Sequence, residues 1–430
     1  MKKNLLKKLC KLSLIAMLSI VMMSSASISG TAASTTAAED YSFPAEWEKQ
    51  SAVWLAWYEY PSIPGMHDVT AQIIENLQNV ARVKVDLIIK PNEKNQVINF
   101  LKNYKIDTNS INFHEYNNLY IYTRDLGPAF VKNSEGKAKV MDFNWNFYGA
   151  GNNVYDKLAL GYLDRDMARQ LNLPTVQSSM VAEGGGYEVN GNGVMMGFKD
   201  MALNRNPGKT IEEIESEILR MYGYKKMIWI DRSPLADKLV VNGPIIENFF
   251  GYGANGHIDE FARFVDPHTI LVAEISKEAR DNNTLERIDY EIVEEMVNKL
   301  KTATDIDGKP FNIIRMPAPD LSDHWYERLI MPGDESYDYY KSLGYKDGDK
   351  VIEIPAVSYL NFLITNNAVI AAKYWEPGKS DRVRQMDEQA KEILQAAFPN
   401  RKIVQINPMA VNGLGGGIHC ITQQQPLLSP

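Results

Sequence analysis

One arrangement of predicted elements recurs five times along the chain. Each copy has a polar motif marked by Gly or Asn, two apolar strand-like runs joined by a turn, an amphipathic helix and a further apolar strand. The copies start near Ser51, Arg124, Glu183, Asn255 and Ser358. Repeated units commonly bury their apolar faces against neighbouring units. We therefore expect an α/β protein of five radially arranged ββαβ-like units, with the polar motifs near a common centre; two domains in a linear array are the alternative.

Hydrophobic periodicity locates the helices and closing strands of these units. The predicted helices cover Asp68–Ala81, Lys157–Leu171, Ile211–Met221, Leu285–Leu300 and Arg382–Phe398. The predicted closing strands include Val83–Ile89, Met227–Ile230, Phe311–Arg315 and Lys402–Ile406. A Gly-rich tail, Gly413–Cys420, follows the last unit. Two segments, Asp231–Gly253 and Met316–Lys350, break the period, and we expect them to be loops that line a substrate entrance.

The first 38 residues have the layout of a secretory signal peptide. Several lysines precede the apolar run Leu12–Met23, and small residues follow from Ser24 to Ala38. The apolar run is shorter than the roughly 20 residues that span a bilayer, so a stable membrane anchor, the competing interpretation, is disfavoured. We expect cleavage, a single mature domain over residues 39–430, and secretion to the periplasm or the extracellular space.

The charge of the chain bears on its partners. Removal of residues 1–38 takes away five lysines and no acid, so the formal net charge falls from −8 to −13. Nucleic acid is therefore an unfavourable partner. An acidic surface attracts small cations, although solubility alone also accounts for such a charge.

The cysteine count points to a nucleophile. Cys10 and Cys420 are the only cysteines, so Cys420 alone remains after removal of the signal and no internal disulfide can form. A lone thiol in an oxidising compartment is a candidate nucleophile, and an inert buried cysteine is the alternative. Cys420 follows a run of glycines, which lets backbone approach a ligand closely. Its thiol, with an unperturbed pKa of about 8.5, needs a neighbouring base or cation to ionise at neutral pH.

Two histidines are candidates for that neighbour. His419 is adjacent in sequence and, in an extended segment, would point away from Cys420. His257 and Asp259 are two residues apart and would share one face of a strand; a purely structural pair is the alternative. A His-x-Asp pair is also compatible with metal binding, but the remaining histidines lack the spacing of metal ligands, so a metal site is the weaker interpretation.

Carboxylates at the starts of other units indicate a cationic substrate. Asp125 and Glu183 occupy such positions, where acids more often cap turns. A guanidinium group is planar, permanently charged and rich in N–H donors, so paired carboxylates suit its recognition.

Six motifs, in order, then carry a resemblance to a known family. They span residues 43–48, 123–128, 183–185, 204–207, 255–259 and 415–426, the last two reading Asn-Gly-His-Ile-Asp and Gly-Gly-Gly-Ile-His-Cys-Ile-Thr-Gln-Gln-Gln-Pro. Together they resemble the agmatine deiminase and bacterial peptidylarginine deiminase group of the pentein, or guanidino-group-modifying, family. The resemblance covers nearly all of the mature chain, and its last two motifs are highly specific.

The resemblance implies a five-bladed pseudosymmetric α/β propeller, the pentein fold, with the active site on its axis. It implies that Cys420 is the nucleophile, His257 the general acid and base, and Glu183 the acid that supports the histidine. It also implies that Asp125 and Asp259 hold the guanidinium.

Asn361 is a further candidate of the substrate-binding set, on less specific evidence. The implied reaction is hydrolytic deimination through a covalent thiouronium on the cysteine, without a cofactor.

The substrate is less constrained than the reaction. Bacterial peptidylarginine deiminases of the secreted type are known for arginines that clamp a peptide carboxylate after the Arg-Asp motif. This chain has no arginine between Arg124 and Arg165. We therefore expect agmatine to be converted to N-carbamoylputrescine and ammonia. Export favours the alternative, a secreted enzyme that converts peptidylarginine to citrulline.

Two further functions are compatible with the same motifs. A non-catalytic guanidine- or peptide-binding protein would need only the carboxylates, so the presence of both Cys420 and His257 argues against it. An amidinotransferase would share the covalent intermediate and pass the group to an amine. The oligomeric state is not predicted.

Overall fold

The protein's structure is a computed structural model that describes residues 40–149 and 161–428. Residues from Asp40 onward form one compact unit. The expected signal peptide lies outside the described residues. Among the helices in the described ranges, none combines the length and apolar character needed to cross a bilayer.

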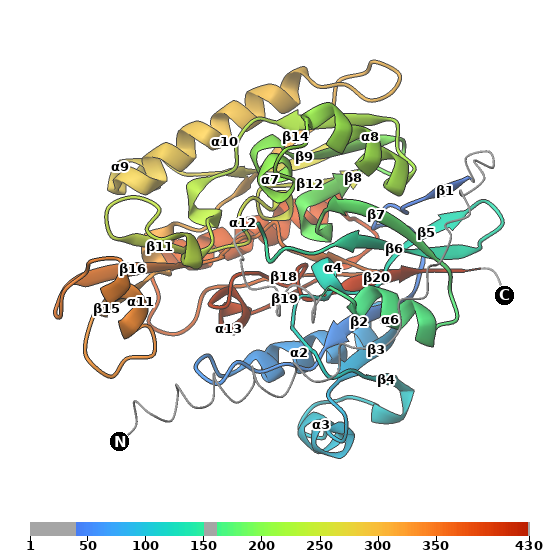
Figure 1. Cartoon of the computed structure of the whole chain (residues 1–430), viewed down its shortest axis with the longest axis horizontal. Coiled ribbons are helices and arrows are strands. Elements are labelled where there is room, and N and C mark those ends of the chain that lie inside the picture. The colour runs from blue at the N-terminus through green and yellow to red at the C-terminus, as the bar shows by residue number, and fades with distance from the viewer. Residues whose placement is uncertain (1–39, 150–160, 429–430) are drawn as a thin grey trace, which may run out of the picture. The chain divides into compact units, whose positions relative to one another are not determined.

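Five sheets share one strand order (Figure 1). In each, the central strand pairs antiparallel with the first strand and parallel with the third. The sets are β5 (Ala129–Asn133), β6 (Ala138–Asn144) and β7 (Thr175–Val181); β8 (Tyr187–Val189), β9 (Val194–Phe198) and β10 (Lys226–Ile230); β12 (Ala262–Asp266), β13 (Thr269–Glu274) and β14 (Asn312–Pro317); β17 (Leu363–Ile364), β18 (Ala368–Ala372) and β19 (Lys402–Ile406); and β20 (Gln423–Pro426), β2 (Gln50–Ala56) and β3 (Lys84–Ile89). Strand β1 (Tyr41–Ser42) extends the first set, and β4 (Ile111–Glu115) extends the last.

The last strand of the chain pairs with a strand near its start. Strand β20 pairs antiparallel with β2, which places Gln423 opposite Trp54. On its other side β2 runs parallel to β3, with Val53 opposite Val85. The C-terminal strand thus completes the sheet of β2, β3 and β4. This pairing does not fit two domains in a linear array.

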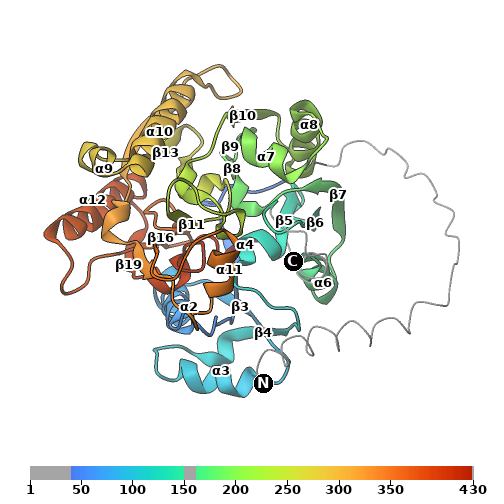
Figure 2. The same cartoon turned by 60° about the vertical axis from the view of Figure 1, so that its left-hand side comes forward.

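One major helix accompanies each set of strands. Figure 2 shows α2 (Met66–Asn76), α6 (Leu163–Gln170), α8 (Ile211–Tyr222), α10 (Thr284–Thr302) and α12 (Asp381–Ala397) around the outside of the strands. Helix α8 illustrates how the sequence sets their limits. Thr210 and Glu213 form a reciprocal capping box at its start, and Gly223 ends it with a φ of 71°. Ile214 and Ile218, four residues apart, are buried on its inner face.

Most predicted elements occur within a few residues of their expected limits. The helix expected from Asp68 is α2 continued by a π-helical turn, Leu77–Ala81. The helix expected from Lys157 is described only from Gly161 onward, where α6 begins at Leu163. Shorter helices include α3 (Lys94–Leu101), α4 (Thr123–Leu126), α7 (Lys199–Arg205), α9 (Lys277–Asn282), α11 (Tyr337–Ser342) and α13 (Met409–Asn412).

Parts of the two segments expected to be loops form a sixth sheet with the strand that follows the second segment. Strand β11 (Phe249–Tyr252), from the first segment, runs parallel to β16 (Lys350–Pro355), and β15 (Tyr326–Leu329), from the second, pairs antiparallel with β16. Figure 1 shows β15 and β16 together with α11. Phe250, Tyr340 and Val351 are buried in one cluster. The prediction of loops was wrong for β11 and β15, because each is a short strand whose pairing with β16 cannot be recognised from its own segment.

Candidate active site

Each candidate functional side chain lies just before the first strand of a repeat. Asp125 precedes β5, Glu183 precedes β8, Asp259 precedes β12, Asn361 precedes β17 and Cys420 precedes β20. The equivalent position of every unit therefore carries a polar group or the thiol. The contacts between these groups show that the repeats bring them together.

Cys420 is buried among polar side chains. Its Sγ lies 3.2 Å from Asn361 Nδ2, 3.6 Å from Asp259 Oδ2 and 3.8 Å from Glu260 Oε1. Asn361 Oδ1 also accepts hydrogen bonds from the backbone N–H groups of His419, at 2.9 Å, and Cys420, at 3.3 Å. Asn361 was predicted to belong to the substrate-binding set; in the structure it contacts the nucleophile and its backbone.

The environment keeps the free thiol protonated. Burial, followed by the negative charges of Asp259, Glu260 and Asp125, raises the pKa of Cys420 well above its usual value. A cationic group placed among these carboxylates would reverse that effect, because it would stabilise the thiolate. The site is therefore organised to activate its thiol when a cation is bound.

His257 is buried with both ring nitrogens free. Its Nδ1 lies 3.9 Å from Asp125 Oδ1 and its Nε2 lies 3.8 Å from Glu183 Oε2, both beyond hydrogen-bonding distance. Neither nitrogen has a hydrogen-bond partner among the described residues. Burial by itself lowers the pKa of His257, but Asp125, Glu183 and Asp259 outweigh it and raise the pKa to about 9. An imidazolium held in this way can give a proton to a bound substrate.

The His257 segment is not the strand that its spacing suggested. Residues Ile258–Glu260 form a single 3-10 turn that begins after His257. The backbone N–H groups of Gly256 and His257 donate to Asp237 Oδ2, at 2.6 and 2.8 Å. Two hydrogen bonds to one buried carboxylate thus fix the segment, and His257 and Asp259 still reach the same site through the turn.

Arg205 supports the acid behind His257. Its Nε donates to both oxygens of Glu183, at 2.8 and 3.1 Å, and the pair is fully buried. Burial raises the pKa of Glu183, but the charges of Arg205 and His257 outweigh it and lower the pKa. The sequence analysis included Arg205 in the family motif at residues 204–207 but gave it no role. That motif was the only indication in the sequence that Arg205 belongs to the site.

Asp125 is held by neutral groups. Its Oδ2 accepts from the Tyr148 hydroxyl at 2.9 Å, and its Oδ1 accepts from the Gly185 N–H at 3.0 Å. Burial raises the pKa of Asp125 despite the opposing charge of His257. Gly185 has no room for a side chain, since a Cβ there would lie 2.5 Å from His257 Nδ1.

Asp259 is held by an ionic partner on one side only. Its Oδ2 lies 2.7 Å from His419 Nδ1, whereas its Oδ1 has no hydrogen-bond partner in the described part of the chain. The hydroxyl of buried Tyr122 is likewise without one within those residues. Tyr122 and Cys420 both pack against Gly416. A Cβ on that glycine would lie within 3.2 Å of both side chains. The site therefore contains buried polar atoms that a bound ligand could satisfy.

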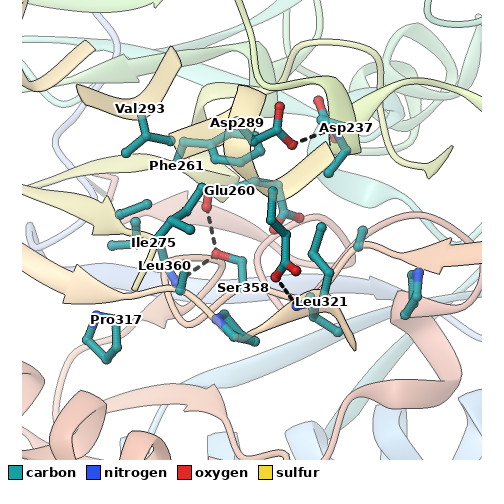
Figure 3. Close-up of a pocket in the computed structure, with 18 residues that line it drawn as sticks. Asp237, Glu260, Phe261, Ile275, Asp289, Val293, Pro317, Leu321, Ser358 and Leu360 are labelled. Carbon is teal, nitrogen blue, oxygen red and sulfur yellow. Dashed lines mark hydrogen bonds between the residues drawn. The ribbon is translucent and has the colours of Figure 1, made fainter. Parts of the chain in front are cut away.

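A cavity of about 60 Å³ adjoins the site behind Glu260 (Figure 3). The 18 residues that line it include Glu260 but neither Cys420 nor His257. The Ser358 hydroxyl donates to the Glu260 carbonyl oxygen at 2.6 Å and so fixes the residue between cavity and thiol. Burial, then Asp259 and Asp237, raises the pKa of Glu260 well above its usual value. Sequence analysis missed Glu260; its position directly after Asp259 was the available signal.

Two groups of side chains have donor atoms within 4.8 Å of one another, as a metal ion would require: Glu46, Glu188 and His419; and Asp259, Glu260 and Cys420. In the first group Arg263 already contacts both carboxylates at 2.6 Å. A cation there would have to displace an existing ion pair. The second group is the cluster around the thiol described above.

Comparison with known proteins agrees with this geometry. The model of the Porphyromonas-type peptidyl-arginine deiminase family matches residues 42–426. The chain belongs to this family. It is 28% identical to the agmatine deiminase of Pseudomonas syringae pv. syringae, over 91% of this chain and 97% of that protein. It is 27% identical to the agmatine deiminase of Medicago truncatula, over 90% and 97%.

A solved structure of the agmatine deiminase of Enterococcus faecalis has the same fold. It superimposes with a TM-score of 0.71 at 24% identity, over 90% of this chain and 96% of that chain. The protein is accordingly a hydrolase of the deiminase class, acting on a carbon–nitrogen bond of a linear amidine. The predicted family membership and enzyme class are confirmed.

Proposed function

We propose that the protein deiminates agmatine to N-carbamoylputrescine and ammonia through a covalent thiouronium on Cys420. The observation that carries this proposal is the cluster of buried, incompletely hydrogen-bonded groups around the thiol. Asp259 Oδ1 and both nitrogens of His257 have no protein partner among the described residues. A guanidinium satisfies the free Asp259 oxygen with its fork of N–H donors, and the free nitrogens of His257 leave its proton available to the substrate.

Binding and activation are coupled in this proposal. Asp125 and Asp259 hold the guanidinium with its central carbon facing the Cys420 sulfur. The substrate's positive charge offsets the carboxylates that disfavour the thiolate, so the thiol releases its proton to solvent when substrate is bound.

The reaction then proceeds in two halves. The thiolate attacks the guanidinium carbon and forms a carbon–sulfur bond. His257 donates its proton to one nitrogen, the carbon–nitrogen bond breaks, and ammonia leaves a cationic thiouronium. The neutral imidazole next takes a proton from water, whose oxygen attacks the same carbon. The carbon–sulfur bond breaks to regenerate the thiolate, and the remaining hydroxyl proton leaves with ammonia as ammonium.

The choice of agmatine rests on two observations. The relatives named above are agmatine deiminases, and the match to this chain covers nearly their whole length. The segment Asp142–Gly149, which contributes Tyr148 to Asp125, contains no arginine to pair with a substrate carboxylate. A buried carboxylate without a partner would cost several kcal/mol.

Deimination of peptidylarginine is the second candidate, because the matching family model is named for that activity. Steady-state ammonia release from agmatine, free arginine, and peptides with internal or C-terminal arginine separates the two. We expect the highest kcat/KM for agmatine. A clear preference for a peptide would assign the second activity.

The covalent step is tested by Cys420→Ser. We expect this variant to fold and to lose turnover, because a serine hydroxyl does not ionise at neutral pH. Ammonia release by the folded variant would contradict the mechanism. Mass spectrometry of the wild-type protein quenched during turnover should detect the substrate-derived adduct on Cys420.

Two structural expectations belong to the same proposal. The common strand order of five sheets and the pairing of β20 with β2 support a closed five-bladed propeller. The basic, apolar and small-residue order of residues 1–38 supports secretion. Sequencing the N-terminus of the exported protein would test the cleavage.

A further inference from the structure

The N-terminal segment reaches the active site through one histidine. His419 is buried, with Nδ1 2.7 Å from Asp259 Oδ2 and Nε2 2.6 Å from Glu46 Oε1. Glu46 lies between β1 and β2, His419 lies just before β20, and Asp259 lies just before β12. Three separate parts of the chain therefore meet in one hydrogen-bonded line that ends beside the thiol.

Both ends of this line are negatively charged. Glu46 is also 2.6 Å from Arg263 Nη2 and 3.1 Å from Arg124 Nη1. Burial by itself raises the pKa of Glu46, but His419, Arg263 and Arg124 outweigh it and hold the pKa well below its usual value. The pKa of Asp259 is also lowered, since the interactions with His419, His257 and Arg263 exceed the effect of burial.

The ring of His419 is fixed by these contacts. Both of its nitrogens lie within hydrogen-bonding distance of a carboxylate oxygen, Nδ1 of Asp259 and Nε2 of Glu46. A ring engaged on both sides holds the Asp259 carboxylate in one orientation.

We propose that His419 and Glu46 are positioning residues for Asp259: they fix its Oδ2 and thereby present Oδ1 to the cationic group of the substrate. The inference rests on the proposed function, because it assigns Asp259 to guanidinium binding. It adds a function for the residue next to the nucleophile and for a carboxylate some 370 positions away. Neither residue contacts the reacting atoms in this arrangement.

Two substitutions of equal charge separate positioning from packing. In His419→Asn the amide nitrogen replaces Nδ1 and can still donate to Asp259, but the link to Glu46 is lost. In His419→Gln the amide nitrogen replaces Nε2 and can still donate to Glu46, but Asp259 is released. Both variants lose the imidazole ring, so a difference between them reports the hydrogen bond to Asp259. His114→Asn and His114→Gln are matched controls, since His114, on β4, also contacts a buried carboxylate, Asp86 on β3, at 2.7 Å.

The readout should not require turnover. Alkylation of Cys420 by chloroacetamidine, whose amidinium resembles the guanidinium, is compared with alkylation by neutral chloroacetamide. The ratio of the two rates measures cation positioning independently of the thiol's general reactivity. We expect this ratio to fall about tenfold or more in His419→Gln, and by less than threefold in His419→Asn and in the His114 variants.

Agmatine kinetics provide the second readout. His419→Gln should raise KM by about tenfold or more relative to His419→Asn, with a smaller difference in kcat.

Equal alkylation ratios and equal KM values for the two His419 variants would overturn the positioning role. A wild-type protein that shows no preference for the amidinium reagent would overturn it as well. If instead the alkylation pattern is as expected but no guanidine is hydrolysed, the positioning role stands and the proposed function fails. If one of the two His419 variants does not fold, the alkylation ratio of the other is compared with that of the wild-type protein. The changes in this ratio given above are then expected for the variant that folds.

Discussion

Two halves of the candidate site contain the same kinds of residues at different distances. One half has Asp125, His257, Glu183 and Arg205; the other has Asp259, His419, Glu46 and Arg263. The nitrogens of His257 stay 3.8 and 3.9 Å from their carboxylates, whereas those of His419 lie 2.6 and 2.7 Å from theirs.

The difference of about 1 Å separates two chemical roles. A histidine with free nitrogens can exchange protons with a ligand, because its hydrogen bonds are still to be made. A histidine engaged on both sides is held in place and orients its neighbour. The residue types alone do not distinguish these roles, and the experiments below test whether the distances do.

The largest expected effect belongs to the histidine with free nitrogens. In His257→Gln, kcat should fall by about 10²–10⁴-fold, because general acid and base catalysis are both lost. KM should change much less. Steady-state ammonia release measures both constants. His67→Gln is the control, since His67 stacks on Trp57 with ring centroids 4.1 Å apart and contacts none of the site residues named here. Retention of kcat within fivefold in His257→Gln would assign the acid to another group.

The two carboxylates should respond differently to neutralisation. Asp125→Asn and Asp259→Asn should each reduce kcat/KM by an amount corresponding to about 2–5 kcal/mol. Only Asp259→Asn should also lower the free energy of unfolding, because the folded protein favours the charged form of Asp259 and disfavours that of Asp125. Chemical denaturation at neutral pH measures this difference. Equal losses of stability would contradict the proposed asymmetry between the two halves.

His257 should also make stability depend on pH. Its pKa is raised from 6.5 to about 9 in the folded protein. Its contribution is therefore fully present below pH 6.5 and is lost as the pH rises through 9, on the order of 1–3 kcal/mol. The groups that face it are Asp125, Glu183 and Asp259.

Denaturant titrations of the wild type and His257→Gln at pH 6, 7.5 and 9 would test this dependence. The wild type should lose more stability than the variant across that range. Parallel losses would show that His257 is not the titrating group.

The smallest expected effect concerns the backbone beside His257. Gly185→Ala would place a Cβ 2.5 Å from His257 Nδ1 and 3.0 Å from Asp259 Oδ2. Overpacking of this kind costs about 1–3 kcal/mol, and kcat should fall with it. Gly413→Ala is the matched control, because the nearest atom to its Cβ is at 3.5 Å. Wild-type stability and kcat in Gly185→Ala would contradict this prediction, because they would show that His257 can shift without loss of function.

Local sequence signals were sufficient for the repeats and the nucleophile. The turns before β6, β9, β13 and β18 and the apolar spacing of α8, α10 and α12 are properties of short segments, so they could be recognised without tertiary contacts. Cys420 was identified because it is the only cysteine outside residues 1–38. The family motifs supplied the roles of His257, Glu183, Asp125 and Asp259; in the structure Asp259 contacts Cys420, and His257 lies between Asp125 and Glu183.

Other features depend on contacts between distant segments. The sixth sheet exists because β11 and β16 pair across about 100 residues, and the His419 line exists because residue 46 approaches residue 419. The sequence alone determined which residue types stand before each first strand and how often the unit repeats. Only the tertiary structure decided that His257 keeps free nitrogens while His419 does not, because a difference of about 1 Å between their distances to carboxylates is set by how whole sheets pack.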